Sequence, residues 1–213
     1  MKRVLDRNQD KAEAIRTLLK EKGVKMYNFI SSPGAGKTSL FEQTLANMKD
    51  RLKIGIIEGD VTTDRDAQRL KQYGLPIVLI NTDGGCHLDS NSIEKALEEF
   101  KLDELDVLFV ENVGNLVCPS NFDLGETSKI AVVSTSEGDD KPIKYPMLFR
   151  DAKAVILNKM DIMRYTNFNY DAFHRDLRQV NPEVPLFETS CTNGDGLEQW
   201  YEWLEEEIKE NNG

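Results

Sequence analysis

A glycine-rich segment that ends in a lysine and a threonine has the residue types of a phosphate-binding loop. Residues 31–38 read SSPGAGKT and lie between a short apolar run and an amphipathic run. They fit the pattern G-x-x-x-x-G-K-[ST] with Ser31 in place of the first glycine; an ordinary glycine-rich turn with a surface lysine is the alternative. In such a loop backbone N–H groups point at phosphate oxygens, the lysine reaches the β- and γ-phosphates, and the threonine hydroxyl suits Mg²⁺. The nucleotide-binding residues that it predicts are Pro33, Gly34, Ala35, Gly36, Lys37, Thr38 and Ser39.

A second motif, directly after a later apolar run, indicates which base is bound. Residues 158–161 read NKMD. The carboxylate of Asp161 can accept hydrogen bonds from both N1–H and the exocyclic amine of guanine, and adenine offers no such pair of donors. A buried acceptor left unpaired costs roughly 1–3 kcal/mol, so the motif favours GTP over ATP. The expected base-binding residues are Asn158, Lys159 and Asp161, with Ser190 and with Cys191 as a small packing residue in the loop after the last apolar run.

Acidic residues follow two further apolar runs. Residues 58–60 read EGD and residues 111–115 read ENVGN. Acids at strand ends beside a phosphate loop are expected to hold Mg²⁺ and to sense the γ-phosphate, and residues 60–67 form the natural first switch. No arginine finger or water-positioning glutamine is evident in these motifs, so intrinsic turnover should be slow. The Mg²⁺ residues that we expect are Thr38, Asp60, Asp66 and Glu111; with Lys37 they form the catalytic set, and Gly114 joins the nucleotide-binding residues.

Three soft ligands accompany this predicted site. Cys86 and His87 follow one apolar run and Cys118 follows the next, so a parallel sheet would bring them to one edge. Two thiolates and an imidazole suit Zn²⁺ or Ni²⁺ better than Mg²⁺ or Ca²⁺. Buried packing residues, or a Cys86–Cys118 disulfide, which a reducing cytosol disfavours, are the alternatives. A fourth ligand would be water, another side chain or a group from a second protomer, and His174, the other of the two histidines, is expected to be structural or on the surface.

The composition excludes several classes of protein. The 213 residues are 39% hydrophobic, which is enough for a buried core, and the net charge of −10 disfavours nucleic acid and anionic lipid as partners. No apolar stretch approaches the roughly 20 residues that span a membrane, and the N-terminus mixes charges too finely for a signal peptide. We therefore expect a cytoplasmic protein without membrane or nucleic-acid partners.

Short apolar runs alternate with amphipathic stretches from residue 25 onward. This pattern predicts an α/β fold, a three-layer phosphate-loop NTPase with a mostly parallel sheet of about seven strands covered on both faces. We expect one domain over residues 1–213, with residues 1–24 as an N-terminal helix packed on it. The predicted strands are 26–30, 54–57, 77–80, 107–110, 130–133, 154–157 and 185–187. The predicted helices are 11–22, 37–49, 64–73, 90–100, 170–180 and 197–209.

Taken together, these motifs closely resemble the HypB family of nickel-inserting hydrogenase maturation GTPases. That family belongs to the SIMIBI class and is kin to the urease accessory GTPases. The resemblance runs from about Met26 to Trp203. It rests on SPGAGKT at 32–38, GDV at 59–61, CHLD at 86–89, ENVGNLVCP at 111–119, EGDDK at 137–141 and NKMD at 158–161.

The resemblance implies a metallochaperone that hydrolyses GTP to GDP and couples this to nickel delivery during [NiFe]-hydrogenase maturation. It implies a homodimer in the GTP-bound state, a nickel-supplying maturation protein and a hydrogenase large subunit as partners, and Ni²⁺ or Zn²⁺ at Cys86, His87 and Cys118. Lys144 would cross to the partner's nucleotide site, with a solvated surface lysine as the alternative. Some members carry an N-terminal cysteine cluster or histidine-rich run; residues 1–25 contain neither, which argues against nickel storage.

Three other functions are compatible with the sequence. The client could be a different nickel enzyme such as urease. The chain could be an ATP-dependent metabolic kinase or ligase with a structural zinc, which guanine selectivity would exclude. It could also be a metallochaperone whose nucleotide is a static ligand, which multiple-turnover phosphate release would exclude.

Overall fold

The computed structural model describes residues 2–59, 69, 71–82 and 84–210, with side chains from Arg7 onward. The described strands form one seven-stranded sheet in the order β3-β2-β4-β1-β5-β6-β7, and every pair is parallel. The expected α/β fold is confirmed, and the sheet is parallel throughout. The strands are β1 (Lys25–Ser31), β2 (Ile54–Glu58), β3 (Ile77–Leu79), β4 (Val107–Glu111), β5 (Ser128–Ser134), β6 (Ala152–Asn158) and β7 (Leu186–Glu188).

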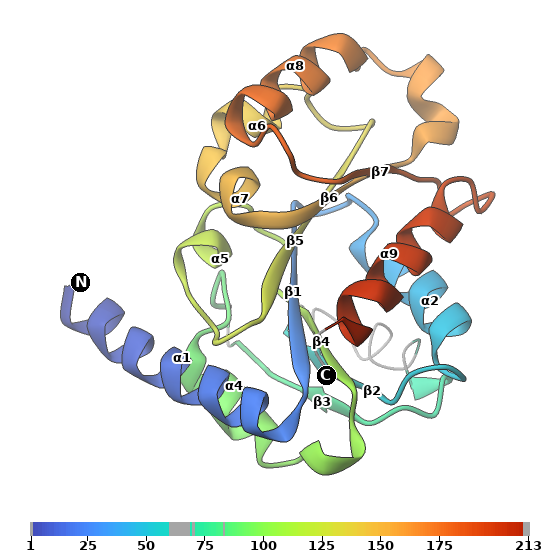
Figure 1. Cartoon of the computed structure of the whole chain (residues 1–213). Coiled ribbons are helices and arrows are strands. Elements are labelled where there is room, and N and C mark those ends of the chain that lie inside the picture. The colour runs from blue at the N-terminus through green and yellow to red at the C-terminus, as the bar shows by residue number, and fades with distance from the viewer. Residues whose placement is uncertain (1, 60–68, 70, 83, 211–213) are drawn as a thin grey trace.

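Helices cover both faces of the sheet, with α2 and α9 on one face and α1, α4, α7 and α8 on the other (Figure 1). Strand β1 is buried on both faces: Phe29 packs toward α2 and α9, and Met26 toward α1 and α4. A strand of this kind reads as a continuous apolar run. The helices are α1 (Lys2–Lys22), α2 (Lys37–Met48), α4 (Ser90–Leu97), α5 (Cys118–Asn121), α6 (Lys141–Lys144), α7 (Pro146–Asp151), α8 (Tyr170–Val180) and α9 (Leu197–Lys209), with 3₁₀ turns η1 (Leu102–Glu104) and η2 (Met160–Tyr165).

The N-terminal helix α1 is longer than the amphipathic pattern predicts and packs against α4. Ile15 and Leu19 are buried in a cluster with Ile93 and Leu97. The side chain of Asn8 adds polar contacts, because its Oδ1 accepts from the Ser90 backbone N–H over 2.9 Å. Both apolar and polar contacts therefore hold α1 to the sheet.

Some predicted elements differ from the structure. The helix predicted to end at Phe100 ends at Leu97, and most of the one predicted over 64–73 lies outside the described residues. Helices α5, α6 and α7 are each at most 6 residues long, too short to show a helical period. Each has a proline in its first turn, and this proline is the sequence feature that indicates where the helix begins.

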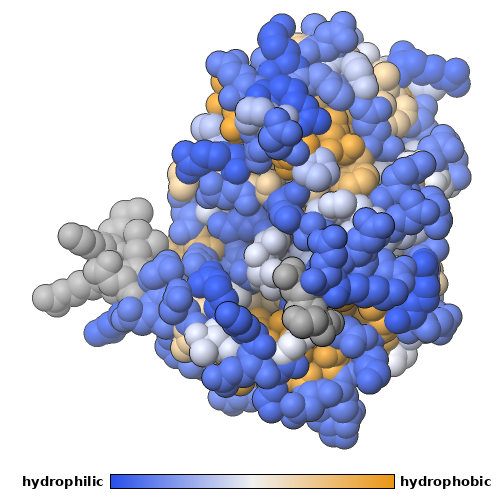
Figure 2. All heavy atoms as spheres, in the orientation of Figure 1, coloured by the Kyte–Doolittle hydropathy of each residue, from blue (hydrophilic) through white to orange (hydrophobic). Residues whose placement is uncertain are grey.

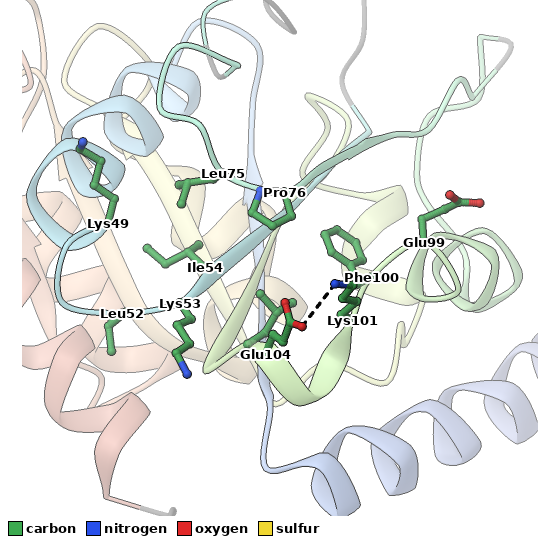
Figure 3. Close-up of a pocket in the computed structure, with 11 residues that line it drawn as sticks. Lys49, Leu52, Lys53, Ile54, Leu75, Pro76, Glu99, Phe100, Lys101 and Glu104 are labelled. Carbon is green, nitrogen blue, oxygen red and sulfur yellow. Dashed lines mark hydrogen bonds and ion pairs between the residues drawn. The ribbon is translucent and has the colours of Figure 1, made fainter.

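The described surface is mostly hydrophilic (Figure 2) and has hollows away from the carboxyl edge of the sheet. Hydrophilic side chains cover most of the face in Figure 2, and within the described residues no helix is long and apolar enough to cross a bilayer. A hollow at the amino edge of the sheet has Ile54 and Phe100 on its wall, and Lys101 is paired with Glu104 there over 3.3 Å (Figure 3). Its lining includes no cysteine or histidine, and it lies at the edge opposite the glycine-rich loop.

Candidate nucleotide and metal site

The glycine-rich loop joins the end of β1 to the start of α2. Gly34 and Gly36 have φ of +81° and +91°, conformations that favour glycine. A Cβ on Gly36 would also overlap the side-chain amide of Asn158. Ser31 is the last residue of β1, buried and in register with Val132, so its position needs no left-handed backbone. The serine in place of the first glycine is therefore compatible with a phosphate loop.

Lys37 and Thr38, at the start of α2, contact the end of β4. The Lys37 ammonium donates to the backbone carbonyl of Asn112 and lies 3.6 Å from Glu111 Oε1. Thr38 Oγ1 donates to the same carboxylate oxygen over 2.8 Å. Glu111 Oε2 is buried and has no hydrogen-bond partner among the described residues, and it lies beside the Thr38 hydroxyl; both groups are hard oxygen ligands of the kind that suits Mg²⁺. Asp60 and Asp66, expected in the same shell, lie outside the described residues.

Glu58 is a further buried carboxylate at this edge that the motifs did not assign. It ends β2 and stands in register with Glu111 on β4. Both side chains are 1% exposed. The EGD motif placed an acid at this strand end, but only the register shows that Glu58 and Glu111 are neighbours.

The predicted guanine motif is bonded to the glycine-rich loop. Asn158 Nδ2 donates to the Ala35 carbonyl over 3.1 Å, and Lys159 Nζ donates to the Gly34 carbonyl over 2.6 Å. Lys159 itself has φ of +62°, which directs the chain out of β6. A loop at the carboxyl end of one strand is thereby fixed to the loop at the end of another.

The loop after β7 lies against the predicted guanine motif. Ser190 Oγ donates to Asp161 Oδ1 over 2.7 Å, and the Cys191 backbone N–H donates to Asn158 Oδ1 over 3.3 Å. Burial raises the pKa of the Cys191 thiol to about 11, so the thiol stays protonated at neutral pH. Its environment is that of a packing residue, as expected.

Two other predicted nucleotide-binding residues lie in segments that follow β4 and β5. Gly114 is half-buried in the bend after β4. Lys144, on α6, is exposed and pairs with Asp140 over 2.6 Å. Its role toward a partner chain stays a prediction.

Cys86, His87 and Cys118 meet at the same edge. One ligand atom from each lies within 4.8 Å of the other two, and no other such group of three occurs within the described residues. The thiols of Cys86 and Cys118 are free, so the alternative of a disulfide is not what the structure shows. This donor set suits a soft or borderline cation such as Zn²⁺ or Ni²⁺.

Local contacts orient the soft ligands. The His87 ring stacks on Phe122 at 3.8 Å between centroids, and Asn115 Oδ1 accepts from the Cys118 backbone N–H over 3.3 Å. Burial lowers the pKa of His87, which favours the neutral imidazole that binds metals. The neighbouring Cys118 side chain raises the pKa of the Cys86 thiol above its ordinary value.

Comparison with known proteins identifies the group to which this arrangement belongs. A sequence model described as the CobW/HypB/UreG nucleotide-binding domain matches residues 25–188. The chain is 46% identical over 202 residues to hydrogenase maturation factor HypB of Escherichia coli K12, across 95% of this chain and 70% of that protein. The chain belongs to the HypB group of the CobW/HypB/UreG family.

Two solved HypB structures have the same fold. HypB from Archaeoglobus fulgidus superposes with a TM-score of 0.90 at 35% identity, covering 96% of this chain and 100% of that one. HypB from Helicobacter pylori in complex with nickel gives a TM-score of 0.89 at 40% identity, covering 96% of both chains. Membership in the HypB group makes residues 25–188 a nucleotide-binding domain.

Sequence motifs alone did not assign several residues that shape this HypB-group site. Asn112 and Asn115 lie inside the ENVGN motif. The motif indicates that the segment is functional, but it does not indicate which groups these two side chains bond to. Glu137, in the EGDDK motif, accepts from Ser32 Oγ through one carboxylate oxygen and from the Ser134 backbone N–H over 2.9 Å through the other. It therefore braces the glycine-rich loop against the end of β5.

Proposed function

We propose that this chain hydrolyses GTP and uses the nucleotide cycle to time nickel delivery to a [NiFe]-hydrogenase. One observation carries the proposal: a single segment touches both sites. Glu111, at its start, bonds to Thr38, and Cys118, at its end, is one of the three clustered soft ligands. A change at the phosphates can therefore be passed to the metal ligands along the few residues from Glu111 to Cys118.

The catalytic roles follow from positioning and charge. Phosphoryl transfer depends mainly on neutralising and aligning the phosphates. Lys37 would bind the β- and γ-phosphates, and Thr38 and Glu111 would hold Mg²⁺, which supplies charge neutralisation when bound. Asp60 and Asp66 are proposed members of the same shell. Asp161 would select guanine and, with Ser190, close over the base.

The assembly around this site is also part of the proposal. We assign residues 1–213 to one GTPase domain and a homodimer to the GTP-bound state. A nickel-supplying maturation protein and a hydrogenase large subunit would be its partners. The cytoplasm suits the reaction, because two free thiols as ligands require a reducing compartment.

Multiple-turnover phosphate release, measured with GTP and with ATP, tests the enzymatic part. We expect slow turnover with GTP and little with ATP, and loss of turnover in Lys37→Ala with the circular dichroism spectrum retained. Equal use of ATP would indicate a kinase or ligase. Release that stops after one phosphate per chain would indicate a static nucleotide.

A further inference from the structure

We propose that Asn112 is the positioning residue through which the state of the phosphate loop reaches the metal-ligand loop. This inference rests on the proposed function and identifies how one site regulates the other. Asn112 is the first residue after β4 and is fully buried. It lies within the described structure between the lysine of the phosphate loop and the loop that carries Cys86 and His87.

Asn112 contacts both sites through different atoms. Its backbone carbonyl accepts from the Lys37 ammonium. Its side-chain Oδ1 accepts from the backbone N–H of Leu88 over 3.2 Å and from that of Val113 over 2.9 Å. Leu88 directly follows His87 and is itself buried, so its amide anchors the ligand loop to the end of β4.

The amide of Asn112 cannot turn independently of its backbone. Its Nδ2 donates over 3.1 Å to Oδ1 of Asn28, a fully buried residue in the middle of β1. Its backbone N–H donates over 3.2 Å to the carbonyl of Phe29 on the same strand. Every polar group of the residue is therefore bonded, and a shift of its peptide must be passed to one of its partners.

A bound triphosphate changes the contact at the carbonyl. A phosphate-loop lysine directs its ammonium at the β- and γ-phosphates. The ammonium of Lys37, which here is bonded to the Asn112 carbonyl, then meets the β-phosphate alone in the GDP state and the γ-phosphate as well in the GTP state, so its contact with that carbonyl differs between the two states. Weakening of this charge-assisted bond leaves a buried carbonyl less well satisfied, so the peptide of Asn112 readjusts.

The readjustment reaches the metal ligands by two routes from the same atom. Through Leu88 it moves the loop that carries His87 and Cys86. Through Val113 it moves the segment toward Asn115, whose side chain holds the Cys118 backbone N–H. A common origin for both routes explains how one nucleotide could alter all three ligands together.

The test compares Asn112→Ala with Asn181→Ala as a matched control. The first variant removes the acceptor of the Leu88 amide and leaves the carbonyl that Lys37 contacts. The second removes the side-chain amide of Asn181 at the end of α8, which donates to the carbonyls of Phe149 and Arg150 over 3.0 and 3.2 Å, and it leaves every bond of Asn112 in place. General loss of packing affects both variants, whereas loss of coupling affects only the first.

The measured quantity is the ratio of Ni²⁺ affinities in the GDP-loaded protein and in the protein loaded with a non-hydrolysable GTP analogue. Typical couplings between sites are about 5- to 150-fold. We expect such a ratio in the parent and in Asn181→Ala, and a ratio near one in Asn112→Ala. An unchanged ratio in Asn112→Ala overturns the proposed role of Asn112 and leaves the proposed function standing. A ratio of one in the parent overturns the coupling in the proposed function as well.

Amide hydrogen exchange in the unmodified protein gives a second test that needs no variant. Exchange protection of the Leu88 N–H should differ between the two nucleotide states. The Val155 N–H, bonded over 2.9 Å to the Pro185 carbonyl on the far side of the sheet, serves as the reference amide. Equal protection of Leu88 in both states overturns the proposal, even if Asn112→Ala fails to fold.

Discussion

The hydroxyl of Thr38 donates to the carboxylate of Glu111 over 2.8 Å, which bonds the first turn of α2 to the last residue of β4. The second oxygen of that carboxylate is buried and has no hydrogen-bond partner among the described residues. Lys37, 3.6 Å from the first oxygen, supplies positive charge. The three side chains thus leave one buried oxygen of Glu111 available for a hard cation beside the phosphates.

Glu111→Gln should weaken Mg²⁺ binding, so that a higher Mg²⁺ concentration is needed, and should slow GTP hydrolysis. The amide keeps an acceptor for Thr38 but removes the negative charge that holds the cation. Loss of one supporting group at a metal site typically costs about 10- to 100-fold in affinity or activity. Mg²⁺ titration of GTP turnover measures the effect, with exposed Glu104→Gln at the opposite edge as the control. A half-saturating Mg²⁺ concentration equal to that of the parent would contradict the assignment.

Asp161→Asn should weaken the binding of GTP and strengthen the binding of xanthosine triphosphate. The 2-oxo group of xanthine can accept a hydrogen bond from the new amide. A lost buried hydrogen bond costs roughly 1–3 kcal/mol, or about 5- to 150-fold in affinity. Competition binding with GTP, ATP and xanthosine triphosphate checks this. Asp195→Asn is the matched control because Asp195 lies in the loop after β7 and its carboxylate pairs with Asn193 over 2.7 Å. An unchanged preference for GTP in Asp161→Asn would remove the guanine role.

Cys86→Ala, His87→Ala and Cys118→Ala should each reduce Ni²⁺ and Zn²⁺ binding. Each removes one of three donors that lie within 4.8 Å of one another. Equilibrium dialysis of purified protein gives the metal bound per chain. His174→Ala is the control, since His174 is bonded to Glu188 over 3.0 Å and lies on α8. If the three variants bind as much metal as the control, the cluster is structural.

Lys144→Ala should weaken dimer formation with a non-hydrolysable GTP analogue. Lys144 is held by Asp140 in one chain, so it must exchange that partner for a phosphate to act across an interface. Loss of a charge-assisted hydrogen bond to a phosphate across the interface should raise the dissociation constant of the dimer. Analytical ultracentrifugation measures it, with Lys101→Ala at the opposite edge as the control. Dimerisation as strong as that of the parent would leave Lys144 a surface lysine.

The fold and the ligand sets could be predicted because their signals are local. Strand β1 is buried on both faces and therefore appears as an uninterrupted apolar run. Residues at the carboxyl ends of parallel strands share one edge, which brought Cys86 and Cys118 together in the prediction. Four-residue motifs such as NKMD are contiguous and need no fold to be seen.

The contacts of Asn112 could not be predicted in the same way. Its partners Lys37 and Leu88 lie 75 and 24 residues away, and only the order of strands in the sheet brings them to it. The pairing of Glu58 with Glu111 depends on strand register, which the apolar pattern leaves open. Long-range polar contacts between buried groups leave no periodic trace in a single sequence.

In the proposed function, nucleotide binding and metal binding are coupled, and a Ni²⁺ titration in two nucleotide states measures that coupling. Ni²⁺ is added to the unmodified protein loaded with GDP, and then to the protein loaded with a non-hydrolysable GTP analogue. The two Ni²⁺ affinities should differ by about 5- to 150-fold, and Ni²⁺ should shift the preference between the two nucleotides by the same factor. Identical Ni²⁺ affinities in the two states would contradict the coupling and would make the Cys86, His87 and Cys118 cluster a structural site.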